Sequence, residues 1–104
     1  MNITASQIYK KITKYDSLVS YKAINKAYNL SKKAHANQFR GSGEPYFTHP
    51  LAVADYLVNM RLDSSTIITA LLHDVVEDTD ITLKNIEDEF GSEISKLVDG
   101  VTKL

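Results

Sequence analysis

The chain has 104 residues, of which 43% are hydrophobic and 24% are charged, with a formal net charge of −1 and no cysteine. These values are typical of one small globular domain, and they exclude a disulfide-stapled fold, a thiolate metal site and a cysteine nucleophile. No apolar stretch approaches the ~20 residues that span a bilayer, and the N-terminus lacks the basic and apolar regions of a signal peptide. We therefore expect a cytoplasmic protein without membrane association.

Two helices are expected in the first part of the chain. Apolar residues at helical spacing predict the first over residues 5–15. Asp16 or Ser17 is the expected N-cap of the second, which runs with an apolar side to an end near Gln38.

A loop and a third helix follow. The segment 39–47 contains two glycines and one proline, which is typical of a loop. Thr48 is the expected N-cap of the third helix. Pro50 then falls in the first turn, where its missing N–H costs nothing.

Three further helices complete the predicted all-α domain. Capping and stop residues bound them at 66–78 (after Asp63 or Ser64), 83–91 (after Thr82) and 93–104 (after Ser92). Because no stop signal closes the last helix, the chain is expected to be the front part of a longer domain.

The charges are distributed unevenly between these elements. Residues 1–40 contain eight Lys and Arg and one acid, whereas residues 41–104 contain four Lys and Arg and twelve acids. The basic side chains are spread through helical sequence without interleaved aromatic residues. This pattern favours solvated helix faces over a nucleic-acid surface.

The helix over 66–78 carries the most informative side chains. At about 100° per residue, His73, Asp74, Glu77 and Asp78 share one arc of a helix that is otherwise apolar. Buried carboxylates on one arc repel one another, and a divalent cation would relieve that repulsion. The alternative is that the acids emerge into solvent at the end of the helix. His49, at the start of the preceding helix, can reach a neighbouring helix and complete a metal site.

The pattern of His49 followed by His73-Asp74 resembles the signature of the HD phosphohydrolase superfamily. Surrounding segments resemble, more narrowly, the hydrolase domain of RelA/SpoT homologues: residues 34–38, 40–46, 49–54, 70–79 and 97–104. The resemblance covers about residues 20–104. It implies an HD-domain helical bundle, here a single domain over residues 1–104 with its N-terminal five or six helices and without its C-terminal ones.

The implied activity is metal-dependent removal of the 3′-pyrophosphate from ppGpp or pppGpp in the stringent response. The resemblance implies Mn²⁺ as cofactor, with other divalent metals as alternatives. It assigns His49, His73 and Asp74 as metal ligands.

Other site residues follow from the same resemblance. Glu77 and Asp78 match the family's acidic pair, which activates or orients the attacking water. Arg40, Ser42 and Tyr46 match the loop that contacts the nucleotide. His35 is expected to be structural.

Two departures from the family pattern leave alternatives open. Gly41 stands where a basic residue is usual. The family's fourth metal ligand, an Asp on a later helix, has no counterpart in this sequence. The 104-residue chain itself is therefore expected to bind metal loosely and to be inactive.

The alternative functions are a truncated non-catalytic fragment that binds nucleotide or another chain, and an HD phosphatase acting on a different nucleotide such as NADPH. A truncated domain could also self-associate through exposed core surface.

Overall fold

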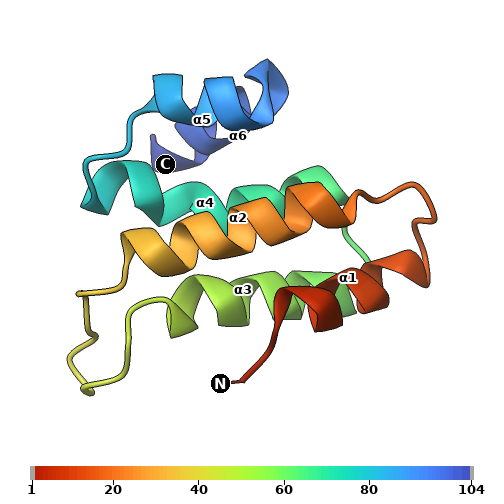
Figure 1. The fold of residues 1–104 in the computed structure, drawn as a ribbon, viewed down its shortest axis with the longest axis horizontal. Helices are drawn as coiled ribbons and strands as arrows, with labels where there is room; N and C mark the ends of the chain where they lie inside the picture. Colours follow the sequence, from red (N-terminus) through yellow and green to blue (C-terminus); the bar gives the residue numbers. More distant parts are fainter. Residues whose placement is uncertain (1, 104) are drawn as a thin grey trace.

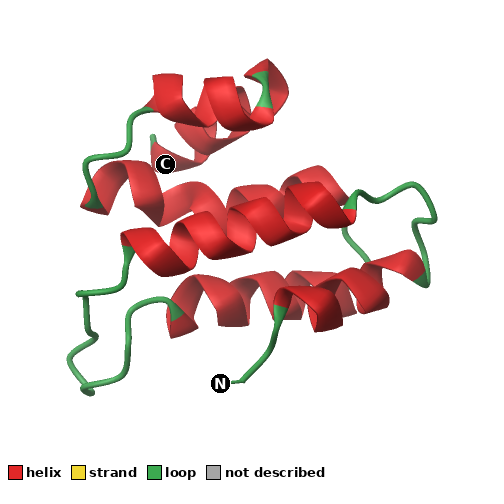
Figure 2. Cartoon of the chain, viewed as in Figure 1, coloured by secondary structure: helices red, strands yellow, loops and turns green. Residues whose placement is uncertain are grey.

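The computed structural model describes residues 2–103, and the protein in this range consists of six α-helices joined by loops (Figures 1 and 2). They are α1 (Ala5–Thr13), α2 (Tyr21–Ala34), α3 (Thr48–Asn59), α4 (Ser64–Asp78), α5 (Leu83–Phe90) and α6 (Ser92–Thr102). Residues 2–103 contain no strand, only an isolated bridge between Phe39 and Pro45. The all-α prediction is confirmed.

The helices lie in three layers, with α1 and α3 in one, α2 and α4 in the next, and α5 and α6 in the third (Figure 1). Helix α4 packs against α2, α3 and α6 and is the centre of the domain. Its residues 67–72 are all buried. A fully buried Leu or Ile side chain stabilises the folded state by roughly 1.5–3 kcal/mol. The burial of α4 therefore fixes the position of the polar residues at its end.

The start and end of α2 differ from the predictions. Its N-cap is Ser20, not Asp16 or Ser17, and the helix ends at Ala34 rather than near Gln38. The Asp16 carboxylate instead accepts a hydrogen bond from a backbone N–H two residues later, which stabilises the connecting turn. The earlier end leaves residues 35–47 free to form the long loop before α3.

The predicted caps of α3 and α6 are also wrong. Phe47 occupies the N-cap position of α3, and the Thr48 hydroxyl donates to the Pro45 carbonyl instead of accepting from the helix. Gly91, not Ser92, precedes α6, and it also ends α5. Its φ of 92° is a conformation that glycine adopts without steric cost, so one residue serves both helices.

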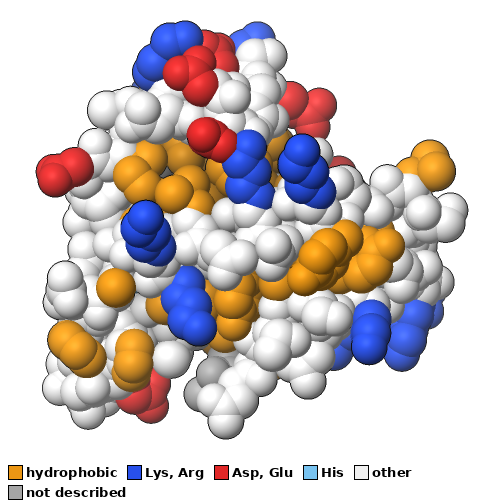
Figure 3. All heavy atoms as spheres, in the orientation of Figure 1, with side chains coloured by type: hydrophobic (Ala, Val, Ile, Leu, Met, Phe, Trp, Pro, Cys, Tyr) orange, Lys and Arg blue, Asp and Glu red, His pale blue; other side chains and the backbone are white. Residues whose placement is uncertain are grey.

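Charged and hydrophobic side chains both lie on the face of the molecule drawn in Figure 3. Lys and Arg side chains are scattered over α2, with apolar patches between α2 and the helices on either side. No helix within residues 2–103 combines the length and apolar character needed to cross a membrane.

Candidate metal centre

Three side chains from α3 and α4 meet at the end of the bundle where α3 begins and α4 ends, on the left of Figure 1. His49 lies in the first turn of α3, and His73 and Asp74 lie near the end of α4. One potential ligand atom from each lies within 4.8 Å of the other two. Within residues 2–103 this is the one such group of His and acidic residues. The structure therefore brings together the three residues that the sequence singled out as ligands.

The His73 ring is oriented by the backbone of its own helix. Its Nδ1 lies 2.7 Å from the carbonyl oxygen of Ala70. Because a carbonyl only accepts, Nδ1 must carry the proton, and Nε2 of the neutral ring keeps its lone pair. Nε2 then faces the Asp74 carboxylate. A hydrogen bond that fixes the tautomer in this way is typical of metal-binding histidines.

The contact between His73 and Asp74 needs a positive charge. Nε2 of His73 lies 3.2 Å from Oδ2 of Asp74, and the neutral ring and the carboxylate would both be acceptors. A proton on Nε2 or a cation beside both atoms would satisfy them. The last turn of α4 contains no basic residue, and its helix dipole is negative at this end. Two imidazoles and a carboxylate suit Mn²⁺, Fe²⁺ or Zn²⁺, so the donor set fits a divalent cation.

Tyr46, from the loop before α3, contacts the same carboxylate. Its hydroxyl donates to Oδ2 of Asp74 at 2.6 Å. Burial raises the pKa of Tyr46, and its hydrogen bond to Asp74 and the charges of Asp74 and Asp78 raise it further. The hydroxyl therefore stays protonated and remains a donor over the physiological pH range.

The acidic pair at the end of α4 is more exposed than the three clustered residues. Glu77 lies one turn beyond His73 and is open to solvent. Asp78 is also exposed, and its charge acts on the Tyr46 hydroxyl. Neither residue belongs to the clustered group. Both are placed to meet water or a bound molecule.

The other two loop residues assigned to the nucleotide, Arg40 and Ser42, differ in position. Arg40 lies beside the cluster, with Nη1 3.4 Å from Nδ1 of His49. This long, exposed contact holds the guanidinium only loosely. Ser42 is exposed in a tight turn that is closed by a hydrogen bond from the Gly43 N–H to the Arg40 carbonyl. The hydrogen bonds of the described residues do not connect Ser42 to the cluster.

Two residues behind Tyr46 were not predicted to support the site. His35 is 1% exposed, and its ring centroid lies 4.8 Å from that of Tyr46. Its Nδ1 lies 2.9 Å from Oε1 of Gln38, whose Nε2 donates to the carbonyl of Asp78. The sequence held one signal of this arrangement, because both residues stand in the segment 34–38 that resembles the family.

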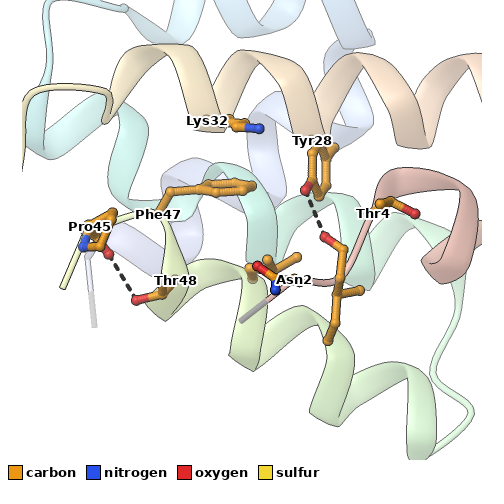
Figure 4. Close-up of a pocket in the computed structure, with 9 residues that line it drawn as sticks. Asn2, Thr4, Tyr28, Lys32, Pro45, Phe47 and Thr48 are labelled. Carbon is orange, nitrogen blue, oxygen red and sulfur yellow. Dashed lines mark hydrogen bonds between the residues drawn. The ribbon is translucent and has the colours of Figure 1, made fainter.

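A separate cavity of about 360 Å³ lies between the N-terminal segment, α2 and the start of α3 (Figure 4). Tyr28 and Phe47 form part of its wall, and the Tyr28 hydroxyl donates to the carbonyl of Ile3 at 2.7 Å. The described residues that line it include no His, Asp or Glu, so it lacks the side chains that most often bind metals.

Known proteins resemble this chain in sequence. The sequence model of the HD domain family matches residues 27–104. A protein of Brucella ovis named GTP pyrophosphokinase rsh is 47% identical over 98 residues, which are 94% of this chain and 13% of that protein.

Two further relatives carry names that refer to hydrolysis. The guanosine-3′,5′-bis(diphosphate) 3′-pyrophosphohydrolase of Vibrio cholerae is 51% identical over 82 residues, 79% of this chain and 12% of that protein. The bifunctional (p)ppGpp synthase/hydrolase SpoT of Escherichia coli is 51% identical over 83 residues, 80% of this chain and 12% of that protein. The chain thus corresponds to about one eighth of the length of the curated relatives it matches.

Proposed function

The chain belongs to the HD domain family, with RelA/SpoT-type proteins as its relatives, and we propose that it forms part of a metal-dependent domain that removes the 3′-pyrophosphate from guanosine polyphosphates. The observation that carries this proposal is the meeting of His49, His73 and Asp74 at one end of the bundle. The names of the Vibrio and Escherichia relatives support the choice of substrate.

The metal-binding role is assigned to the three clustered residues. His73 presents a fixed lone pair, Asp74 supplies negative charge, and His49 reaches across from α3. A divalent cation there, for which we propose Mn²⁺, would supply Lewis-acid polarisation of a phosphoryl oxygen.

The acidic pair is assigned to the attacking water. In the proposed reaction, water attacks the phosphorus that is bonded to the ribose 3′ oxygen, and the bond between that phosphorus and that oxygen breaks. The freed 3′ oxygen takes a proton from solvent to become a hydroxyl, and pyrophosphate is released. Glu77 is exposed one turn beyond His73 and would accept the proton of the water. Asp78, held through its backbone by Gln38, would orient that water.

Contacts to the nucleotide are assigned to the loop before α3. The loosely held Arg40 can turn from His49 toward a phosphate or a base, which its planar charged group suits. Ser42 would contact the nucleotide from the exposed turn. Tyr46 lies at the edge of the same site, and its hydroxyl is already engaged by Asp74.

The proposed activity belongs to a longer domain. The described residues offer three ligands, which leave about three positions of an octahedral ion open. We propose that a further carboxylate ligand completes the site, as the resemblance to RelA/SpoT homologues implies. A cytoplasmic location remains a prediction from the sequence.

The test is pyrophosphate release from ppGpp in the presence of Mn²⁺. We would compare the 104-residue chain with a chimera in which it replaces the matched segment of the Vibrio relative. Activity in the chimera, abolished by chelation, is expected. NADPH as a second substrate tests the alternative specificity. A chimera that is folded but inactive on ppGpp, beside an active parent, would reject the proposal.

A further inference from the structure

The Asp74 carboxylate is restrained at one oxygen by two neighbours. Oδ2 accepts the hydrogen bond of Tyr46 at 2.6 Å and lies 3.2 Å from Nε2 of His73. The side chain is 13% exposed, so solvent reaches little of it. An aspartate side chain turns about two bonds, and rotation about χ1, which has three staggered minima, carries the whole carboxylate to a different place. A firmly placed donor on one oxygen therefore decides which way the carboxylate faces.

Tyr46 is itself held on three sides. Its ring packs on the buried ring of His35, with centroids 4.8 Å apart and planes inclined by 46°. Its backbone N–H donates to the carbonyl of Gln38 at 2.8 Å. Its hydroxyl is engaged by Asp74. The phenol therefore has little freedom to follow the carboxylate if that group moves.

Gln38 connects this arrangement to the last turn of α4. Its side-chain oxygen accepts from Nδ1 of His35, and its side-chain nitrogen donates to the Asp78 carbonyl. We call His35, Gln38 and Tyr46 the tyrosine brace. The brace links the end of α2, the loop before α3 and the end of α4, which are the elements that surround the clustered ligands.

We propose that Tyr46, held by His35 and Gln38, is a positioning residue that fixes the Asp74 carboxylate in the orientation facing His49 and His73. This inference rests on the proposed function, since the orientation matters because the carboxylate binds a cation. Removing an outer partner of a metal ligand typically weakens metal binding by about 10- to 100-fold. This role is distinct from the nucleotide contact that the resemblance suggested for Tyr46.

The structure offers a matched pair of variants. Tyr46→Phe keeps the ring that packs on His35 and removes only the hydroxyl. Tyr28→Phe removes a hydroxyl that donates at 2.7 Å to a backbone carbonyl, in the separate cavity of Figure 4. The Tyr28 ring also packs edge-on against an aromatic partner, Phe47, at 5.0 Å. Both variants lose a tyrosine hydroxyl that donates a hydrogen bond next to an aromatic neighbour, but only the Tyr46 hydroxyl contacts a proposed metal ligand.

Two measurements on the 104-residue chain test the positioning role. Three-bond couplings of the Asp74 β-protons report its χ1 angle without metal. We expect one rotamer in the wild type and in Tyr28→Phe, and averaging in Tyr46→Phe. Titration with Mn²⁺, followed by the electron paramagnetic resonance of the free ion, should show about 10-fold or greater weakening in Tyr46→Phe alone.

Averaging of Asp74 together with weaker Mn²⁺ binding supports the proposal. A single Asp74 rotamer in Tyr46→Phe overturns it, as does a Mn²⁺ affinity equal to that of the wild type. If the wild-type chain binds no Mn²⁺, the assignment of its three metal ligands fails, and the rotamer measurement still decides the positioning role. Gln38→Met provides a second variant if Tyr46→Phe does not fold, with a smaller loss of affinity expected.

Discussion

The two ends of the helical bundle use polar side chains in different ways. At the turn end, where the α1–α2 and α3–α4 connections meet, polar side chains are bonded to backbone groups. Tyr15 donates to the Leu62 carbonyl at 2.6 Å, and Asp63 accepts from the Thr66 N–H at 2.9 Å. At the opposite end, which we call the site end, His73, Asp74 and Tyr46 contact one another.

The difference separates side chains that stabilise the fold from those available for a ligand. A helix cap or a tyrosine hydroxyl that bonds to a backbone group stabilises the fold, and this role explains its presence. The contact of His73 with Asp74 at 3.2 Å is not explained in this way, because it needs a proton on Nε2 or a cation beside both groups. Helix α4 joins both kinds, with its capping acid at one end and the cluster at the other.

The largest expected effect is the loss of metal binding on removal of a site-end ligand. Asp74→Ala or His73→Ala should reduce Mn²⁺ binding by the 104-residue chain below detection, because each removes one of three ligands. Isothermal titration calorimetry measures this. The control is Asp55→Ala, which removes an acid that pairs with Lys11 at 2.8 Å outside the cluster. If Asp55→Ala weakened Mn²⁺ binding as much as Asp74→Ala, the clustered acid would be no more important for the metal than an acid outside the cluster.

The next effect concerns the proposed base at the site end. Glu77→Gln in the Vibrio chimera should lower ppGpp turnover by about 10²- to 10⁴-fold, the usual contribution of general acid–base catalysis. Its Mn²⁺ affinity should stay close to the wild-type value, because Glu77 is outside the clustered group. Steady-state kinetics with a parallel metal titration measure both. A matching fall in affinity and turnover would instead make Glu77 a ligand.

Shortening an apolar side chain in α1 should lower the stability of the fold and leave metal binding unchanged. Ile12 is fully buried, and Ile12→Ala should cost about 2–5 kcal/mol in the free energy of unfolding. Ile12→Val should cost about 0.5–1.5 kcal/mol. Urea denaturation measures both. The folded fraction of each variant should bind Mn²⁺ as the wild type does, and weakened binding in Ile12→Val would show that the two regions are coupled.

The smallest effect is expected at the α4 cap. Asp63→Ala should cost about 1 kcal/mol near neutral pH through the lost bond to the Thr66 N–H. Hydrogen bonding to Thr66 lowers the pKa of Asp63 in the folded protein below its usual 3.8. The charge-dependent part of the stabilisation is therefore present above that value and is lost as the pH falls through the folded pKa. Thermal unfolding from pH 7 to pH 2 should show the wild type and Asp63→Ala converging in acid; a constant difference would contradict this.

The sequence predicted α4 and its contents well, for local reasons. Asp63 precedes an apolar run long enough to be buried on nearly every side, and both signals lie within one helix. The start of α2 was predicted wrongly because Asp16, Ser17 and Ser20 can all cap a helix. The local turn made by Asp16 decided between them, and residue type does not reveal it.

The support behind the candidate site could not be predicted in this way. Tyr46 and Asp74 are 28 positions apart, and their contact depends on the path of the loop before α3. His35 was expected to be structural; it is buried, and its position beneath Tyr46 depends on α2 ending at Ala34. Residue types suggested the ligands, whereas tertiary packing alone defined what holds them.

The most direct test of the proposed metal centre follows the paramagnetic broadening of backbone amide signals on adding substoichiometric Mn²⁺ to the 104-residue chain. If His49, His73 and Asp74 hold the cation, signals from residues 46–49 and 71–78 should broaden first, and those from the turn-end residues 14–20 and 60–64 should remain sharp. Broadening centred on the acidic surface of α5, or spread evenly over the chain, would contradict the assignment of the site end as the metal centre.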